Sequence, residues 1–505
     1  MQDPLIGYFQ SHRKLVEGEA LDLIRSAPQP LDLSRRLIEM AGADSPFVTR
    51  AMVESLLGPA GPPRPPLTTH LESVVEMRKS ESPGASSSPS GFALLREGFE
   101  PLPADRDPLQ AYGGLFAHRF ATLSRILRLR SGLPDLTPIG TFRSREGELS
   151  IIGMVREIRT TSEKHHTIVT IEDDTGTLEA LVPKGSPEVR EPFLLDEVVG
   201  LRVRAGRDRS RIPIVTGVLR PDVPATREQH RTDFEARAVF ISDLHIGSRS
   251  FLADAWGRLA DYLKGQGPEP EVAATVRHVV IAGDLVDGIG IYPNQERDLA
   301  ILDIFEQYAE LGRRLRELPS RIQVVAIPGN HDAVSPAEPQ PALPPPIAAT
   351  LPGPVKVLAN PSTFSLDGVV VTAYHGRGFD DLIPAIPGAS YAKPTDVMKR
   401  MLAMRHLAPM YGGKTPLSPQ SRDGLVIDPV PDIFVTGHAH TFGADRYKGI
   451  LLLNASTWQS ETEYQRMRNI SPVPARAALV RLTDLSLQVL DFSQGTVAPS
   501  EPVAA

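Results

Sequence analysis

The sequence predicts a layered α/β domain preceded by an all-β barrel, and three observations support this fold class. From Ala236 to about Phe492, apolar strand-like segments alternate with helical patterns. From residue 139 to about 220, short alternating strands follow one another without helices between them. Several strands of the α/β region end in polar clusters, and open α/β sheets bind ligands at that end of their strands. We therefore expect a functional site in the C-terminal half.

Length, composition and charge limit the number of domains and the kinds of protein that the chain can be. A chain of 505 residues should hold two or three domains, and 41% hydrophobic residues can build a sizeable core. The absence of cysteine excludes disulfides and thiolate metal sites. A net charge of -7 argues against a protein that wraps nucleic acid with its whole surface. We read no signal peptide and no membrane span, so we expect a cytoplasmic protein without membrane contact.

The N-terminal part predicts a small module on a tether. Residues 1–57 carry three helical patterns that end at Gly58 and Pro59. We interpret them as a helical docking module, with a simple accessory bundle as the alternative. Residues 58–100 contain proline- and serine-rich tracts that cannot bury a core, so we expect a disordered linker.

A helical connector is expected over residues 101–138, with its main helix at Asp107–Arg130. The basic end of this helix could contact phosphates, but a solvated helix face explains it more simply. This basic end consists of Arg125, Arg128 and Arg130.

Residues 139–222 predict an OB-type barrel of five short strands, with a hairpin turn at Asp173–Gly176. Such barrels often bind single strands, but here aromatic residues are missing from the strands, so base stacking is poorly supported. A run of arginines could follow a nucleic-acid backbone instead. Nucleic-acid contact and a purely structural role therefore both stay open. The run comprises Arg202, Arg204, Arg207, Arg209 and Arg211.

Residues 236–495 form the predicted α/β domain, with helices expected at Leu252–Lys264 and Gln295–Leu318. Five of its apolar strands are each followed by a polar cluster. A single histidine of this kind is more often a core residue, but five such clusters together favour a divalent metal site. The clusters are Asp243 with His245, Asp284 with Asp287, Asn330-His331-Asp332, His375, and His438 with His440.

Written as motifs, these clusters are D-x-H, G-D-x-x-D, G-N-H-D, an isolated His and G-H-x-H, and in this order they resemble the calcineurin-like metallophosphoesterases. The resemblance implies a two-sheet sandwich with a binuclear site at its edge. It implies Mn²⁺ as the preferred metal, with Fe²⁺ or Zn²⁺ as alternatives. One ion would be held by Asp243, His245 and His440, the other by Asn330, His375 and His438, with Asp284 bridging both.

The same resemblance implies that the two ions clamp a phosphoryl group for in-line attack. His331 matches the family's catalytic histidine, which is not a ligand and which protonates the leaving oxygen or stabilises the transition state. We expect Asp332 to orient His331. Asp287 is interpreted either as a support for a ligand or as a turn residue.

Gly288 and Asp332 replace the Arg and Glu that phosphoprotein phosphatases of this fold carry, which disfavours a phosphoprotein substrate. Over roughly residues 139–495 the chain is instead similar to the small subunits of archaeal family D DNA polymerases. That resemblance implies a metal-dependent 3′→5′ exonuclease acting on single-stranded DNA 3′ ends, bound to a large catalytic subunit. A sliding clamp is a further candidate partner. The similar stretches are Ser242–Ser248, Gly283–Gly288, Pro328–Ala333, Ala337–Ala342 and Arg405–Pro416.

The sequence is also compatible with two other functions, and two loops each have two possible interpretations. The chain could be a non-catalytic accessory subunit of the polymerase, or a stand-alone nucleotide phosphodiesterase, which would leave the barrel unexplained. In the insert Arg405–Pro416, the side chains of Arg405, His406 and Lys414 either position the DNA backbone or belong to a packing or partner surface. The proline-rich loop Ser335–Ile347 either shapes the cleft mouth or is an exposed spacer.

Overall fold

The computed structural model describes residues 91–494 and 498–499, apart from 104–106, 143–144, 187–190, 206–211 and 468–470, together with parts of the stretch 5–56. The chain divides into two compact units, Met1–Ser88 and Pro89–Ala505. Among the described residues, no helix is long and apolar enough to cross a membrane.

Among the described residues of the first unit are the amphipathic helix α3 (Pro30–Ala41) and two short parallel strands, β1 (Leu15–Val16) and β2 (Phe47–Val48). It has a small core of its own, formed by Leu5, Leu21, Ile24, Leu33, Leu37 and Val53. Residues 58–90 of the predicted linker lie outside the described residues.

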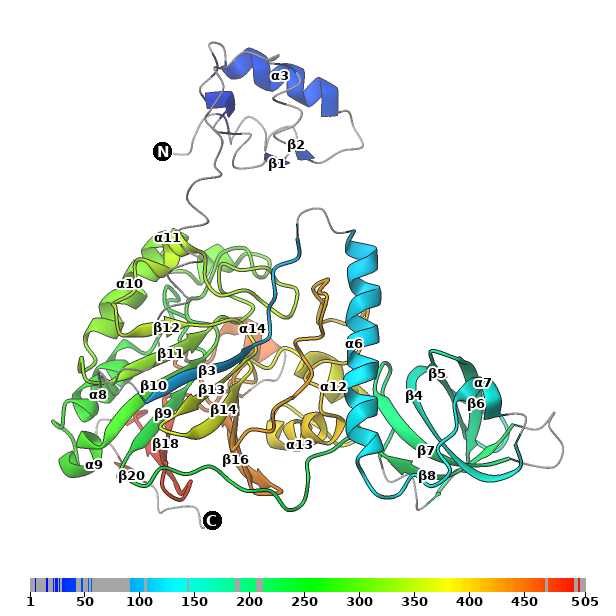
Figure 1. Ribbon diagram of the computed structural model, residues 1–505. Helices are drawn as coiled ribbons and strands as arrows, with labels where there is room; N and C mark the ends of the chain where they lie inside the picture. Colours follow the sequence, from blue (N-terminus) through cyan, green and yellow to red (C-terminus); the bar gives the residue numbers. More distant parts are fainter. Residues whose placement is uncertain are drawn as a thin grey trace, which may run out of the picture. The chain divides into compact units, whose positions relative to one another are not determined.

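Two mixed sheets pack face to face in the second unit (Figure 1). Phe240 and Val280 of the first sheet meet Val371, Val435 and Leu453 of the second in one buried cluster, because alternate residues of each strand point inward. The first sheet has the order β12 (Val355–Val357), β11 (Gln323–Ile327), β10 (Val276–Ala282), β9 (Arg237–Ile241), β18 (Arg476–Arg481), β19 (Leu487–Asp491), β20 (Ala498–Pro499). The second has the order β16 (Phe442–Tyr447), β17 (Ile450–Ala455), β15 (Ile433–Thr436), β14 (Val369–Ala373), β13 (Ser362–Leu366), β3 (Phe92–Glu97).

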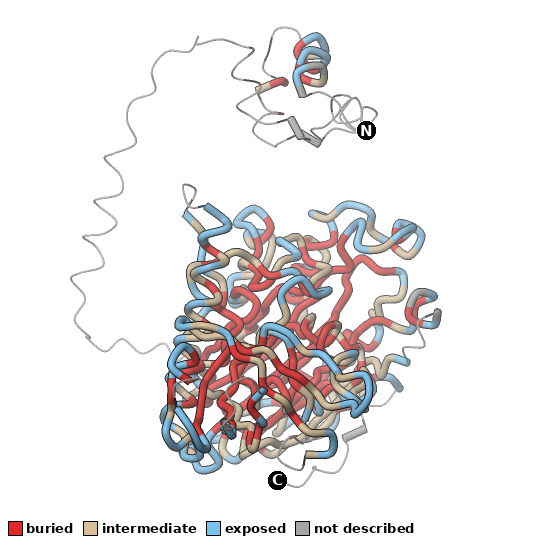
Figure 2. Tube along the Cα trace, turned by 90° about the vertical axis from the view of Figure 1, so that its right-hand side faces the viewer, coloured by how far each residue is buried: buried red, intermediate tan, exposed pale blue. Residues whose placement is uncertain are grey.

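Helices cover the outer faces of both sheets. The central strands β9, β10, β14, β15 and β17 are therefore buried on both sides, in the buried interior that Figure 2 shows. Trp256 and Tyr308 pack from helices onto the first sheet, and Met398 and Met401 pack onto the second. The helices of the first layer are α8 (Ala253–Leu263), α9 (Pro270–Ala274), α10 (Ile304–Arg316) and α11 (Pro345–Ala348). Those of the second layer are α12 (Phe379–Ala385) and α13 (Pro394–Met404), and a short α14 (Glu463–Met467) follows β17.

The helix expected at Leu252–Lys264 is confirmed as α8, but the one expected at Gln295–Leu318 begins later. Only a short 3₁₀ turn, η1 (Gln295–Arg297), forms at its start. The next residues leave the helical path, because the backbone N–H groups of Ala300 and Ile301 both donate to the carbonyl of Gly247. Helix α10 then starts after Asp303, whose side chain caps it by accepting from the Glu306 N–H at 3.0 Å.

Five strands between β3 and β9 close into a mostly antiparallel barrel in the order β4-β5-β6-β8-β7, with one parallel pairing between β6 and β8. This closed barrel and the mixed-sheet sandwich confirm the predicted fold class. Arg202 and Arg204 of the arginine run are exposed on β7, and Arg207, Arg209 and Arg211 lie outside the described residues. The strands are β4 (Gly147–Thr160), β5 (Thr167–Asp173), β6 (Gly176–Val182), β7 (Val198–Ala205) and β8 (Ile214–Leu219), with a short helix α7 (Ile139–Phe142) before them.

Strand β3 shows that the predicted disordered linker extends too far. Residues 92–97 fall within the expected disordered stretch 58–100, yet they pair antiparallel with β13 and form an edge of the second sheet (Figure 1). The apolar run Phe92-Ala-Leu-Leu explains this, since Phe92 packs against Phe364 of β13. The barrel is therefore inserted between a strand of one sheet and the first strand of the other.

Helix α6 (Pro108–Arg128) joins the barrel to the sandwich and confirms the helix expected at Asp107–Arg130, with Asp107 as its cap. Its Arg119 is fully buried and donates to Asp423 at 2.6 Å and to the carbonyl of Pro409 at 2.7 Å. His406 contacts the same carboxylate at 2.8 Å, and Arg405 is buried against the carbonyl of Ile427. The insert Arg405–Pro416 had two interpretations, DNA positioning or packing. For Arg405 and His406, these buried contacts support the packing role.

Replacing Arg119 by alanine is expected to destabilise the protein by about 3 kcal/mol, because it leaves the buried Asp423 without its strongest partner. The loss should appear as a lower midpoint in urea unfolding. Arg125→Ala on the same helix is the matched control, since its ion pair with Asp428 is exposed and should contribute less than about 1 kcal/mol. Equal midpoints for the two variants would contradict the structural role of Arg119.

Candidate functional site

The predicted polar clusters all lie at one edge of the sandwich, on the loops that follow β9, β10, β11, β14 and β15. The backbone of these loops is unusual. Five polar residues have positive φ angles between 49° and 65°, a region that residues other than glycine seldom occupy. Strain of this kind persists only where the surroundings enforce it, and it is common at functional sites. These residues are Asp243, His245, Asp284, His438 and His440.

A first group of ligand atoms comprises Asp243, His245, Asp284 and His440. The Nε2 atoms of His245 and His440 are 3.1 Å apart. Nε2 of His440 lies 3.2 Å from Oδ1 of Asp243, and Nε2 of His245 lies 3.7 Å from Oδ2 of Asp284. Ligands about 2.1 Å from one ion stand roughly 3–3.5 Å apart, so the spacing suits a single cation.

A second group faces the first across Asp284. Nε2 of His375 lies 3.1 Å from Oδ1 of Asn330 and 3.3 Å from Oδ2 of Asp284. The rings of His375 and His438 meet edge to face, with centroids 5.2 Å apart. The same Asp284 oxygen therefore faces both groups, while its other oxygen accepts from the backbone N–H of His331 at 2.9 Å.

The backbone of Gly329 lies very close to the Asp284 carboxylate, which only a residue without a side chain allows. A Cβ atom there would stand 2.2 Å from Oδ1 of Asp284, so any larger residue would displace the central carboxylate.

Hydrogen bonds orient two of the imidazoles toward the site. Nδ1 of His245 donates to Oδ1 of Asp287 at 2.9 Å, and Nδ1 of His375 donates to the carbonyl of Ala282 at 2.9 Å. The Nε2 atoms of both rings therefore face carboxylate and amide oxygens. A proton or a metal cation must lie between such atoms, and imidazole nitrogens with oxygens are the donor set of the divalent metals that the motifs imply, so these residues fit such metals.

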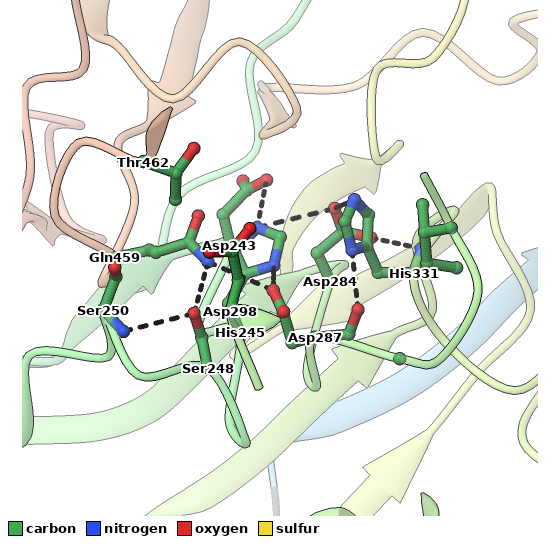
Figure 3. A network of polar contacts seen from close by, with 12 residues as sticks. Asp243, His245, Ser248, Ser250, Asp284, Asp287, Asp298, His331, Gln459 and Thr462 are labelled. Carbon is green, nitrogen blue, oxygen red and sulfur yellow. Dashed lines mark hydrogen bonds and ion pairs between the residues drawn. The ribbon is translucent and has the colours of Figure 1, made fainter. Parts of the chain in front are cut away.

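Asp287 thus supports a candidate ligand and is no mere turn residue. Its carboxylate also accepts from Gln459 Nε2 at 3.1 Å (Figure 3). It accepts from Gln295 Nε2 at 3.3 Å as well. Gln459 in turn donates to Ser248 Oγ at 2.9 Å. This network fixes His245 from the side away from the site.

The charges of the site are strongly coupled. Burial would raise the pKa of Asp284, but His375 and His331 hold that pKa well below its usual range. Burial likewise opposes ionisation of Asp243, and His440 and His245 lower its pKa. Against the effect of burial, Asp284 raises the pKa of His375 to about 10. Cations would have to displace protons from such imidazoles, so metal binding should weaken at low pH.

His331 lies at the open side of the site, with Nε2 3.9 Å from Oδ2 of Asp284. Its Nδ1 donates to the backbone carbonyl of Asp287 at 2.8 Å, so Nε2 is the atom turned toward the site (Figure 3). Burial lowers the pKa of this imidazole.

The expectation that Asp332 orients the His331 ring is wrong. Asp332 accepts from the N–H groups of Leu285 and Gly329 at 3.1 and 2.8 Å and from the hydroxyl of Tyr308 at 2.8 Å. It therefore ties together the loops after β10 and β11, and the Asp287 carbonyl fixes the His331 ring instead. Burial and Asp284 raise the pKa of Asp332 to about 6.

Sequence reasoning missed two further supporting contacts. Nε2 of Gln465 lies 2.7 Å from Nδ1 of His440, and Oδ1 of Asp380 lies 3.2 Å from Nε2 of His438. Tyr391 donates to the same Asp380 oxygen at 2.5 Å. None of these residues stands in a recognisable motif, so only the fold brings them to the site.

Known proteins resemble the chain in sequence. The family of DNA polymerase alpha/epsilon B subunits matches residues 238–444. A "DNA polymerase II small subunit" from Archaeoglobus fulgidus is 42% identical over 370 residues, covering 72% of this chain and 74% of that protein. One of the same name from Halobacterium salinarum is 33% identical over 498 residues, covering 94% of this chain and 96% of that protein. Among solved structures, Vacuolar Protein Sorting 29 from Cryptosporidium parvum is 17% identical with a TM-score of 0.29, covering 54% of this chain and 100% of that one.

Proposed function

The chain belongs to the family of archaeal DNA polymerase II small subunits, and from this premise we propose that it is a metal-dependent 3′→5′ exonuclease. The activity would remove misincorporated nucleotides from the 3′ end of a DNA strand by hydrolysing phosphodiester bonds. The observation that supports this most strongly is the pair of ligand groups that share one oxygen of Asp284. A purely structural subunit would have no need for two such groups of carboxylate, amide and imidazole ligands.

In this proposal Asp243, His245 and His440 would hold one ion, Asn330, His375 and His438 would hold the other, and Asp284 would serve both groups. When bound, the two ions supply positive charge for the phosphate oxygens and activate the attacking water. Mn²⁺ is the preferred metal because the ligands are oxygens and imidazoles without thiolates, with Fe²⁺ or Zn²⁺ as alternatives.

His331 acts at the leaving group in the same proposal. Its Nδ1–H is held by the Asp287 carbonyl, so Nε2 is the nitrogen that would take up a proton and pass it to the departing 3′ oxygen, with the imidazolium as the donating form. Asp332 contributes by fixing the loop on which Asn330 and His331 lie. Asp332 therefore positions this loop, whereas His331 acts on the reacting atoms.

The partner in this proposal is the large catalytic subunit of the polymerase, as the words "small subunit" in the relatives' names imply. A sliding clamp is a further candidate partner. The substrate is the unpaired 3′ end of DNA. The exposed Arg202 and Arg204 of the barrel are candidate contacts for its backbone, and the helical module 1–57 is a candidate docking unit.

A strand labelled at its 5′ end tests the proposal. With Mn²⁺, the chain alone or with its large subunit should convert the strand into a ladder of products shortened from the 3′ end, and EDTA should stop the reaction. No shortening under either condition would contradict the proposal. Rapid hydrolysis of a small diester with no action on the strand would instead favour a stand-alone phosphodiesterase.

A further inference from the structure

The proline-rich loop Ser335–Ile347 is anchored on both sides by backbone hydrogen bonds. The N–H of Glu338 donates to the carbonyl of Pro416 at 2.8 Å, and the N–H of Ser418 donates to the carbonyl of Glu338 at 2.7 Å. Two residues on, Gln340 and Asn360 exchange a pair of backbone hydrogen bonds of 2.7 and 3.0 Å. The loop is therefore no exposed spacer, because it joins the insert to the segment that leads into β13.

Glu338 is a fully buried carboxylate in this loop, with 0% of its surface exposed. Oε2 accepts from the hydroxyl of Tyr374 at 2.7 Å, and Oε1 accepts from Nδ2 of Asn360 at 3.3 Å. Within the part of the chain that the structure describes, no ion pair joins it to a basic residue. Burying a carboxylate without a cation is costly, so its two hydrogen bonds must serve a purpose that an apolar residue could not.

Both partners of Glu338 hold the loop that carries His375. The hydroxyl of Tyr374 also accepts from the N–H of Gly378 at 2.7 Å, which closes the turn around His375. Oδ1 of Asn360 accepts from the N–H of His375 itself at 2.9 Å. The carboxylate thus fixes the hydroxyl and the amide that fix this backbone.

The same network reaches the loop that carries Asn330. Nδ2 of Asn360 also donates to Oε1 of Gln340 at 2.7 Å, and Nε2 of Gln340 donates to the carbonyl of Gly329 at 3.1 Å. Gly329 directly precedes Asn330. Glu338 therefore supports the ligand group of Asn330 and His375. The other group, which contains His245 and His440, is supported by Asp287, Gln459 and Gln465.

We propose that Glu338 is a positioning residue that sets Asn330 and His375 at the spacing one divalent ion needs. This inference rests on the proposed two-ion site. Without the carboxylate, Tyr374 and Asn360 lose their common acceptor, and the two ligand loops can separate. Supporting residues of this kind typically change metal affinity by about 10- to 100-fold. The ion held by Asp243, His245 and His440 should be unaffected.

The test is Mn²⁺ binding by the full chain, measured by equilibrium dialysis and electron paramagnetic resonance. Wild type should bind two ions and give a spin-coupled signal. Glu338→Gln and Glu338→Ala should keep one ion at unchanged affinity, bind the second about 10- to 100-fold more weakly, and give the six-line signal of an isolated Mn²⁺. Tyr374→Phe removes only the hydroxyl between Glu338 and Gly378 and should weaken the second ion in the same direction.

Asp432→Asn is the matched control. Asp432 is also fully buried, but it pairs with Arg227 and His230 and accepts from the N–H of Val370, at the end of β14 away from His375. This variant should lose stability and keep both ions. Unchanged affinity for both ions in Tyr374→Phe and in the Glu338 variants would overturn the inference. A wild-type protein that binds fewer than two ions would instead contradict the proposed function.

Discussion

Replacing Asp284 by asparagine is expected to deplete both metal positions and to lower DNA hydrolysis by about a thousandfold. One oxygen of Asp284 faces both ligand groups, so the loss of its charge weakens both ions together. Charge stabilisation by bound metal contributes several kcal/mol to such reactions, and each 1.36 kcal/mol corresponds to a factor of ten in rate. Elemental analysis of the purified variant, beside its rate on a labelled strand, measures both effects.

Asn330→Ala is the companion variant. Asn330 stands 3.1 Å from His375 and belongs to one group alone, so its loss should deplete mainly one of the two ions. If both variants lost the same amount of metal from both positions, the assignment of Asp284 as the shared ligand would be wrong.

His331→Ala is expected to lower the rate of hydrolysis by about 10²- to 10⁴-fold while metal content stays at the wild-type level. The imidazole lies at the open side of the site with Nε2 toward Asp284, as a group that exchanges a proton with the leaving oxygen requires. The backbone N–H that holds Asp284 is retained in this variant. Single-turnover rates and metal analysis of the same preparation check the two parts of the prediction.

His165→Ala is a matched control for this histidine, because His165 is exposed in the turn between β4 and β5 of the barrel. It should hydrolyse DNA at the wild-type rate. A fall in metal content that parallels the loss of rate in His331→Ala would show that His331 is a ligand, which its position near His245 and Asp287 also permits.

The elements that sequence reasoning predicted share a strong local signal. The strands that precede Asp243, Asp284, Asn330 and His375 are apolar runs ended by glycine or a polar motif, and burial on both faces requires such runs. Because parallel strands of one sheet end at the same edge, the clusters after β9, β10 and β11 could be placed together, and likewise those after β14 and β15. That both sets meet at one edge of the sandwich was implied by the resemblance to the metallophosphoesterases. The barrel was predictable for a similar reason, since its strands alternate in polarity.

The features that were missed depend on contacts between distant segments. Asp332 sits next to His331 in the chain, yet its carboxylate turns to Leu285, Gly329 and Tyr308. Residues 298–303 have helical composition, but hydrogen bonds to the carbonyl of Gly247 hold them in another conformation. The local sequence pattern does not show that Asp332 bonds to these distant groups or that Gly247 accepts from this segment.

Strand β3 has a consequence for how the protein is made. Phe92–Glu97 emerges from the ribosome before the barrel, whereas its pairing partner Ser362–Leu366 emerges after it. The nascent chain therefore carries an unpaired, leucine-containing edge segment during the synthesis of most of the protein, a state that favours aggregation. For the same reason, a recombinant fragment that starts at the barrel or at Ala236 would leave the edge of β13 bare and should self-associate.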